Sequence, residues 1–321
     1  MKLLITRPLP PRVIDAALEK FDVTVRQMTL PLSRPEVTES LRNFDLVLPT
    51  LRDIYDAGAF AAVARPRARM LGNFGVGYNH IDVAAAEAAG IVVSNTPGAV
   101  TDATADIAMM LILMVARRAG EGERLVRSGG WEGWHPTEML GLHVSGKVVG
   151  IVGMGRIGRA VARRCHHGFG MAVKFCNRSL VADAGVPAEQ LATVRELAAQ
   201  VDVLVAAVPG GAATRHLIGA DVLAAMQPHA IVVNISRGDV VDEAALIAAL
   251  QARRIGGAGL DVYEREPAVP EALRMLENVV LLPHLGTAAL EVREAMGLMA
   301  VDNLVAFAEG RDPPNRVAAA P

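Results

Sequence analysis

A glycine-rich segment in the middle of the chain sets the strongest limit on its fold. The sequence VVGIVGMGRIGRAVARR, residues 148–164, has a G-x-G-x-x-G pattern between a β-branched run and an apolar helical pattern. This context predicts a strand, a tight turn, and a helix whose free N–H groups face a pyrophosphate. We therefore expect a dinucleotide-binding domain in which the cofactor contacts Gly153, Met154, Gly155, Arg156, Ile157 and Gly158.

Short strands alternate with helices along the rest of the chain. Apolar runs occupy residues 2–6, 22–26, 44–50, 69–74 and 90–96, and helical stretches separate them. Six further strands are expected at 148–153, 173–176, 201–209, 230–236, 257–263 and 278–284. Strand–helix alternation predicts parallel sheets with helices on both faces. The expected fold class is α/β, with two doubly wound parallel-sheet domains.

The boundary between these domains is expected near an apolar helix that begins at residue 101. A long last helix, at about 288–309, is expected to return to the first domain. The sequence thus predicts one domain of residues 1–100 plus 287–321 and a dinucleotide-binding domain of residues 101–286. Ligands of open α/β sheets bind at the carboxyl ends of strands. We expect a cleft between the two domains.

Composition excludes several classes of protein. The net charge of −2 offers no broad cationic field, so nucleic acid is not an expected partner. Two cysteines, Cys165 and Cys176, are too few for a disulfide scaffold or a metal cluster and are expected to be reduced core thiols. The longest apolar run, residues 107–116, is about half of a membrane span. We expect a soluble cytoplasmic protein that binds neither metal nor membrane.

The end of the second strand of the dinucleotide-binding domain indicates which cofactor binds. An acidic residue is usual there, about twenty residues after the last glycine, because it accepts from the ribose 2′-OH of NAD. This chain has Asn177, Arg178 and Ser179 instead. Arg can form a forked contact with a 2′-phosphate, and Asn and Ser can donate to its oxygens. The turn favours NADPH, with NAD(H) possible, unless Arg178 is only a solvated surface residue.

Three further strand ends carry groups suited to catalysis. Arg237 follows the strand at 230–236, Asp261 and Glu266 follow the next one, and His284 ends the last. A His paired with a Glu can deliver a proton near neutral pH, and an Arg can bind a carboxylate with two hydrogen bonds. Each residue alone is more simply explained as structural. Together, beside a dinucleotide loop, they predict a catalytic site.

With these motifs the chain resembles the D-isomer-specific 2-hydroxyacid dehydrogenase family over essentially its whole length. The resemblance lies in NFGVGYNHIDV, NTPGAVTDATADIA, GIVGMGRIGRAVARR, VVNISRGDVVDE, GLDVYEREP and LLPHLGTA. It is most similar to the glyoxylate/hydroxypyruvate reductase branch, which shares GGWEGWHP and a non-acidic turn like NRS. The family implies a flavodoxin-like substrate domain, a Rossmann domain and a homodimer.

The resemblance also implies roles for individual residues. Arg237 would bind the substrate carboxylate and polarise the keto oxygen, while His284 would donate the proton as hydride arrives. Glu266 would orient His284 and keep it charged as an acid. The loop Gly75–Gly77 would offer backbone N–H groups, at Val76 and Gly77, to the carboxylate. Cofactor contacts would come from Thr104, Ile235, Ser236 and Asp261.

Several residues fit this pattern less clearly. Many relatives have Asp where Asn79 stands, and His80 in the same loop is expected to be a structural hydrogen bonder. Trp131 and Trp134 are expected to be aromatic anchors in a subunit interface, and the second resembles a Trp that reaches into the partner's active site. Arg52 faces either the pocket or solvent.

The sequence therefore predicts an NAD(P)H-dependent enzyme that reduces small 2-keto acids, such as glyoxylate and hydroxypyruvate, to D-2-hydroxy acids. Alternatives on the same scaffold are a larger sugar keto acid such as 2-ketogluconate, or 3-phosphoglycerate or phosphite. Glu266 argues against formate, because formate dehydrogenases lack this partner of the His. A dinucleotide-sensing binding protein is the non-enzymatic alternative.

Overall fold

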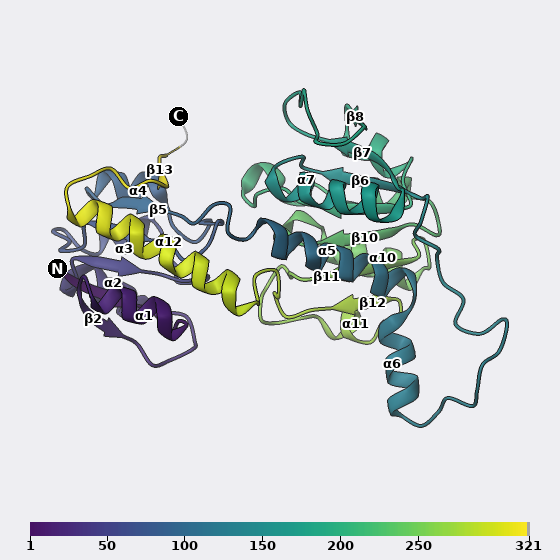
Figure 1. Ribbon diagram of the computed structural model, residues 1–321, viewed down its shortest axis with the longest axis horizontal. Helices are drawn as coiled ribbons and strands as arrows, with labels where there is room; N and C mark the ends of the chain where they lie inside the picture. Colours follow the sequence, from purple (N-terminus) through teal and green to yellow (C-terminus); the bar gives the residue numbers. More distant parts are fainter. Residues whose placement is uncertain (320–321) are drawn as a thin grey trace. The chain divides into compact units, whose positions relative to one another are not determined.

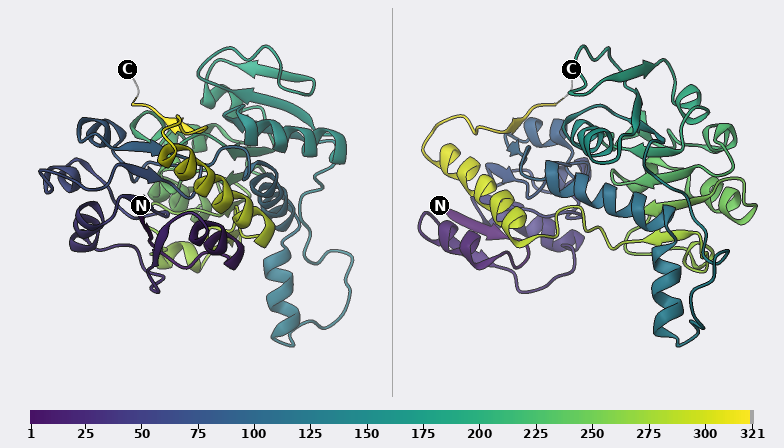
Figure 2. Two further views of the ribbon diagram at one scale, coloured as in Figure 1. Left: turned by 60° about the vertical axis from the view of Figure 1, so that its left-hand side comes forward. Right: turned by 45° about the vertical axis from the view of Figure 1, so that its right-hand side comes forward.

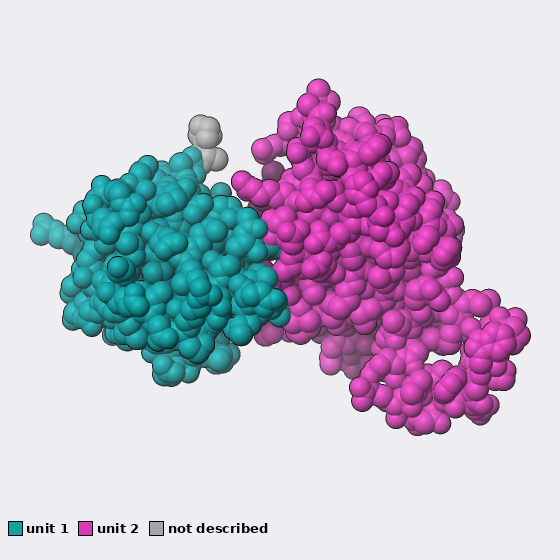
Figure 3. Space-filling model, in the orientation of Figure 1, with its two compact units in different colours: residues 1–100, 288–321 teal, residues 101–287 magenta. Residues whose placement is uncertain are grey.

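The computed structural model describes residues 1–319, drawn in Figure 1 and from two further directions in Figure 2. The chain forms two compact units, coloured separately in Figure 3. Unit 1 comprises residues 1–100 together with the segment from residue 288 onward, and unit 2 comprises residues 101–287. Each unit is built on its own sheet, so the expected class of two parallel-sheet α/β domains is confirmed.

The sheet of unit 1 has the order β13-β5-β4-β3-β1-β2. Its strands β1 (Lys2–Ile5), β2 (Asp22–Val25), β3 (Leu46–Leu48), β4 (Met70–Gly72) and β5 (Val92–Ser94) lie in the five predicted apolar runs. Their ladders are all parallel, and without β13 the order is 2-1-3-4-5, the flavodoxin-like arrangement. The short β13 (Arg316–Val317), which was not predicted, adds antiparallel to β5.

Helices cover both faces of this sheet. They are α1 (Pro11–Leu18), α2 (Arg34–Asn43), α3 (Ala57–Ala61), α4 (Val83–Ala88) and α12 (Leu290–Ala308). Side chains alternate along β1, so Leu4 joins the core under α2, α3 and α4, while Leu3 and Ile5 join the core under α1 and α12. The last helix therefore packs in unit 1 beside α1 (Figure 1).

The sheet of unit 2 has the order β12-β11-β10-β9-β6-β7-β8, entirely parallel. Its strands are β6 (Val148–Val152), β7 (Ala172–Cys176), β8 (Ala188–Leu191), β9 (Val203–Ala206), β10 (Ile231–Asn234), β11 (Gly257–Leu260) and β12 (Val279–Leu281). Numbered from β6, this is the doubly wound order 3-2-1-4-5-6 with one strand added. The order reverses between β6 and β9, where ligands bind in such sheets.

One face of this sheet carries α5 (Thr101–Ala116) and α7 (Arg156–Arg163), and α7 continues as the π-helix η1 (Arg164–Gly168). The other face carries α8 (Val194–Ala198), α9 (Ala220–Ala225), α10 (Glu243–Gln251) and α11 (Glu271–Arg274). Short 3₁₀ turns η2 (Ala212–Thr214) and η3 (Gly238–Val240) follow β9 and β10. Cys165 is buried and Cys176 half-buried, and neither is in a disulfide.

A second helix after α5 departs from the sequence prediction. The sequence predicts a single helix from residue 101, whereas α5 ends at Ala116 and a separate helix, α6 (Ala119–Arg127), precedes the coil of residues 130–147. Figures 1 and 2 show α6 and this coil extending away from the sheet of unit 2. We call residues 119–143 the arm. Among the described residues, no helix is long and apolar enough to cross a membrane.

Candidate active site

The glycine loop joins β6 to α7 in unit 2, with a geometry that suits a bound pyrophosphate. Gly153 has φ +98°, and a Cβ there would lie 2.7 Å from the carbonyl oxygen of Ala207. A Cβ on Gly158 would lie 2.1 Å from the Gly153 carbonyl oxygen, so α7 can approach the loop only with glycine there. A Cβ on Gly155 would meet nothing within 4 Å, which leaves open space before the helix. This space at the amino end of α7 is where a phosphate group would fit.

The turn after β7 closes against the glycine loop. The backbone N–H of Met154 donates to Asn177 Oδ1 at 3.2 Å, and Asn177 Nδ2 donates to the Ser179 carbonyl oxygen at 3.0 Å. The amide of Asn177, which the sequence predicts as a cofactor contact, fixes this turn. Arg178 and Ser179 are exposed, and the Arg178 side chain makes no hydrogen bond or ion pair within residues 1–319.

His284 and Glu266 form a hydrogen-bonded pair after neighbouring strands. His284 Nδ1 lies 3.0 Å from Glu266 Oε2, and the backbone N–H of Tyr263 donates to the other carboxylate oxygen at 3.2 Å. His284 itself has φ +55°, an unusual conformation for a non-glycine residue. Its Nε2 makes no hydrogen bond in the described chain. The pair therefore has one ring nitrogen anchored and one available to a ligand.

Burial and charge act in opposite directions on this pair. Burial alone would raise the pKa of Glu266, but its hydrogen bond with His284 and the nearby Arg237 guanidinium hold that pKa below its ordinary value. Burial also lowers the pKa of Arg237, against the attraction of Glu266 and Asp239. Even so, a guanidinium remains charged at neutral pH. Glu266 is accordingly a carboxylate between two groups that can carry positive charge.

Asp261 and Thr104 hold the segment that follows His284. Asp261 is 1% exposed, and its two carboxylate oxygens accept the N–H groups of Leu285 at 2.6 Å and Gly286 at 2.8 Å. The hydroxyl of Thr104, on α5, donates to the Gly286 carbonyl oxygen at 3.1 Å. Burial raises the pKa of Asp261 despite these donors. Both residues were predicted to contact cofactor, and in the structure their polar groups bind this segment.

Arg237 lies at the end of β10, where a buried asparagine organises the turn. The Arg237 Nη1 donates to the carbonyl oxygen of Ser236 at 2.7 Å. Asn234, 1% exposed, donates to the Arg237 carbonyl oxygen at 2.8 Å and accepts the Ser236 N–H at 3.0 Å. Ile235 and Ser236 are buried between them. The sequence analysis did not identify Asn234. The pattern that identified Arg237, a polar residue at the end of an apolar strand, applies to Asn234 as well.

In unit 1, the predicted carboxylate loop follows β4. Gly75 has φ +144°, and its carbonyl oxygen accepts the Thr96 N–H at 3.1 Å. The N–H groups of Val76 and Gly77 donate to no atom of residues 1–319. This part of unit 1 therefore offers two unused backbone donors.

Comparison with known proteins agrees with this geometry. The family model for the D-isomer specific 2-hydroxyacid dehydrogenase NAD-binding domain matches residues 109–286, more than half of the chain. The chain belongs to the D-isomer-specific 2-hydroxyacid dehydrogenase family. It is accordingly an oxidoreductase with a domain for a nicotinamide dinucleotide.

Relatives of this dehydrogenase match it along nearly its whole length. A glyoxylate reductase of Thermococcus onnurineus is 41% identical, covering 98% of this chain and 95% of that protein. The crystal structure of the TT0316 protein from Thermus thermophilus has a TM-score of 0.91 and 39% identity, covering 99% of this chain and all of that one. An NADPH-dependent glyoxylate/hydroxypyruvate reductase of Sinorhizobium meliloti, solved with NADP and malonate, has a TM-score of 0.87 and 37% identity, covering 99% and 96%.

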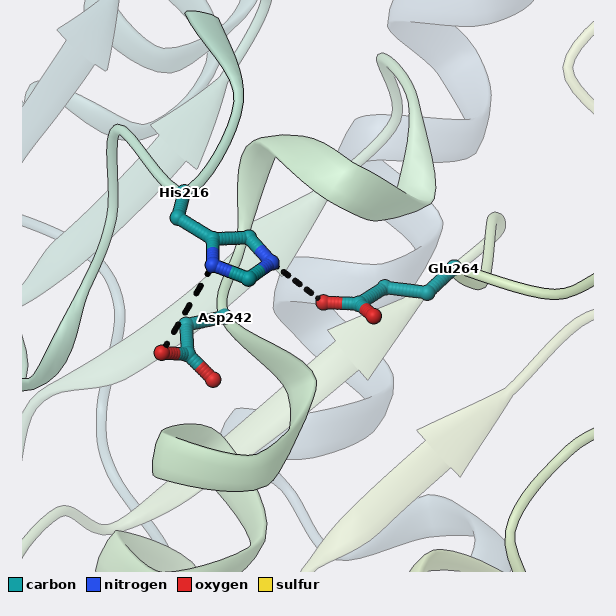
Figure 4. Close-up of side chains that lie close together, drawn as sticks. All are labelled: His216, Asp242 and Glu264. Carbon is teal, nitrogen blue, oxygen red and sulfur yellow. Dashed lines mark hydrogen bonds and ion pairs between the residues drawn. The ribbon is translucent and has the colours of Figure 1, made fainter.

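A second group of ionisable side chains in the dehydrogenase, which the sequence did not suggest, lies near the active-site loops (Figure 4). His216 Nε2 lies 2.7 Å from Glu264 Oε1, and His216 Nδ1 lies 3.8 Å from Asp242 Oδ2. Figure 4 shows the two carboxylates at different nitrogens of the ring. One ligand atom from each of the three residues lies within 4.8 Å of the others, and the His216–Glu264 hydrogen bond joins two loops of unit 2.

The remaining predicted residues of the dehydrogenase are at its surface or in turns. Trp131 and Trp134, in the arm, are 56% and 81% exposed. Arg52 lies in the turn after β3 with φ +74°. His80 Nε2 is 3.0 Å from Asn73 Oδ1, a hydrogen-bonding position of the kind expected for it. Asn79 is exposed in the same loop.

Proposed function

We propose that this chain reduces small 2-keto acids, such as glyoxylate and hydroxypyruvate, to D-2-hydroxy acids, with NADPH preferred over NADH. The observation that carries the proposal is the His284–Glu266 pair, 3.0 Å apart with the second ring nitrogen of His284 unused, beside Arg237. It occurs in a chain whose relatives include glyoxylate reductases at about 41% identity. These relatives do not favour 2-ketogluconate or a binding function.

The proton step uses the free nitrogen of His284. Glu266 accepts from Nδ1, so the imidazolium presents its remaining proton at Nε2. That proton passes to the keto oxygen as hydride reaches the keto carbon, and the hydroxy acid leaves a neutral imidazole. The carboxylate of Glu266 fixes the ring orientation and stabilises the imidazolium.

The carboxylate of the substrate needs fixed positive groups. Arg237 supplies a permanently charged fork that can bind it and polarise the adjacent keto oxygen. The unused N–H groups of Val76 and Gly77 supply a second contact from unit 1. We therefore assign unit 1 as the substrate domain and unit 2 as the cofactor domain.

The fit to a nicotinamide dinucleotide rests on the open space at Gly155 and the unobstructed amino end of α7. When bound, the cofactor supplies the hydride. Arg178, which is exposed and has no hydrogen bond or ion pair within residues 1–319, is suited to a 2′-phosphate, and Ser179 can add a donor. The S. meliloti reductase was solved with NADP, which supports the same choice here.

Steady-state kinetics with both cofactors test the proposal. We expect glyoxylate and hydroxypyruvate to oxidise NADPH with a lower KM for NADPH than for NADH. If neither compound oxidises either cofactor faster than background, the substrate assignment is wrong.

The cofactor preference has its own test. Arg178→Ala should raise the KM for NADPH by roughly tenfold, because a forked charged contact is lost, and leave the KM for NADH near its wild-type value. Arg195→Ala is the matched control, since Arg195 is an exposed arginine on α8 of the same unit. An unchanged ratio of the two KM values in Arg178→Ala would show that Arg178 is only a surface residue.

A further inference from the structure

The three carbonyl groups of the loop Gly75–Gly77 all accept hydrogen bonds. The Gly75 carbonyl oxygen accepts from Asn73 Nδ2 at 3.0 Å and from the Thr96 N–H at 3.1 Å. The Val76 carbonyl oxygen accepts from Asn95 Nδ2 at 2.9 Å, and the Gly77 carbonyl oxygen accepts from Asn73 Nδ2 at 3.2 Å. With the carbonyl oxygens bound in this way, the N–H groups of Val76 and Gly77 stay available for an anion.

Asn73 donates two of these hydrogen bonds. Its side chain is fully buried, at 0% exposure, directly after β4. One amide nitrogen thus reaches two carbonyl groups that lie two residues apart. A buried amide with every group paired is a rigid support, whereas an unpaired one would cost free energy.

The orientation of this amide is fixed by a third partner. His80 Nε2 lies 3.0 Å from Asn73 Oδ1, so it donates to that oxygen. A rotated amide would place its oxygen against the carbonyl oxygens of Gly75 and Gly77. With the amide oxygen toward His80, the ring pairs with it as the tautomer that carries a proton on Nε2. The three partners therefore select one orientation of Asn73.

We propose that Asn73 is a positioning residue for substrate binding, which holds the Gly75–Gly77 loop in the conformation that presents two N–H groups to the substrate carboxylate, with His80 fixing its amide. The inference rests on the proposed function, because the anion it serves is the carboxylate of the keto acid. Asn73 itself touches the loop and not the substrate. Its loss should weaken carboxylate binding more than it slows proton or hydride transfer.

The test measures binding of oxalate, a carboxylate that cannot be reduced, by calorimetry on the full chain saturated with NADPH. We expect Asn73→Ala to bind oxalate roughly tenfold more weakly than wild type, since the carbonyl groups of Gly75 and Gly77 both lose the Asn73 donor. Asn73→Asp fills the same space and keeps the acceptor for His80 but cannot donate as a carboxylate, so it should bind oxalate at least as weakly. For glyoxylate, KM should rise by a similar factor while kcat changes less than about threefold.

Ser40→Ala is the matched control. Ser40 is also buried in unit 1, where its hydroxyl bonds the Val37 carbonyl oxygen at 2.7 Å and Tyr55 Oη at 2.8 Å. Its removal should lower the melting temperature and leave oxalate binding unchanged. If Asn73→Ala behaves like Ser40→Ala, with lower stability and wild-type oxalate affinity, Asn73 has only a structural role and the inference is wrong.

Two further outcomes are informative. If Asn73→Ala does not fold, His80→Ala serves instead, with oxalate binding expected to weaken about threefold; wild-type affinity there would overturn the inference. Wild-type protein that fails to bind oxalate would also overturn it. Turnover of glyoxylate by wild type is a separate measurement, so a wrong positioning role and a wrong proposed function give different results.

Discussion

At the level of single residues, His284 is held through both its side chain and its backbone. Its Nδ1 is 3.0 Å from Glu266, and its backbone N–H donates to the Asp261 carbonyl oxygen at 3.0 Å. His284→Gln keeps a polar side chain but removes the proton donor. We expect kcat for glyoxylate to fall by about 10²–10⁴-fold, with the KM for NADPH unchanged. Undiminished turnover would contradict the proton-transfer role.

Glu266 links the same site to acid stability. Its pKa is below the ordinary value of 4.5 in the folded chain, so the folded state binds fewer protons there than the unfolded state. Its contribution to stability is therefore full above about pH 4.5 and is lost as the pH falls through the folded pKa. Glu266→Gln should melt below wild type near pH 7, and the two melting curves should converge below about pH 4.5. A difference that is independent of pH would contradict this account.

The sequence was informative for charged groups at strand ends and less so for the amides beside them. Arg237, Glu266 and His284 stand out because together they follow three neighbouring strands, β10, β11 and β12. Asn73 and Asn234 occupy similar positions, but asparagine is common in turns and most of the partners of these two are backbone groups. The bonding of Asp261 to Leu285 and Gly286 was equally hidden, because it depends on how two strand ends lie side by side.

At the level of elements, the success of prediction followed the strength of the hydrophobic pattern. The eleven apolar runs all became strands, whereas β8, with the sequence AEQL, has two exposed and two half-buried residues and no apolar alternation. It exists because β7 offers a parallel partner along Val173–Cys176. The arm helix α6 has no buried residue. Its sequence therefore lacks the buried apolar face by which the other helices were predicted.

The contact between α7 and the glycine loop gives a prediction at this level. Gly158→Ala would bring a Cβ to 2.1 Å from the Gly153 carbonyl oxygen, whereas Gly168→Ala meets nothing within 4 Å. We expect Gly158→Ala to lower the free energy of unfolding by about 1–3 kcal/mol and to weaken NADPH binding. Gly168→Ala should stay within about 1 kcal/mol of wild type or be more stable. Denaturant unfolding and cofactor titration check both, and equal effects of the two substitutions would argue against this contact.

At the level of the whole molecule, the two units have the same kind of sheet but carry different candidate ligand-binding groups. Apart from the antiparallel β13, both sheets are parallel with a strand order that reverses within the sheet, and in both the candidate ligand groups follow the carboxyl ends of strands. Unit 2 carries the glycine loop and the ionisable groups, while unit 1 carries the free N–H groups after β4. The proposed reaction needs both sets, because a keto acid presents a carboxylate and a developing alkoxide together.

The arm is the part of the molecule whose exposure best supports self-association. Trp131, Trp134 and Leu140 are 56%, 81% and 67% exposed. Large aromatic side chains such as the two tryptophans are usually buried against other protein groups, and they are enriched at interfaces. We expect sedimentation velocity to show a dimer at micromolar concentration, and Trp131→Ala combined with Trp134→Ala to shift it toward monomer. Met275→Ala is the control, since Met275 is 73% exposed in unit 2 but lies outside the arm, and it should leave the dimer intact. A wild-type monomer, or a dimer unaffected by loss of both tryptophans, would show that the arm has no such role.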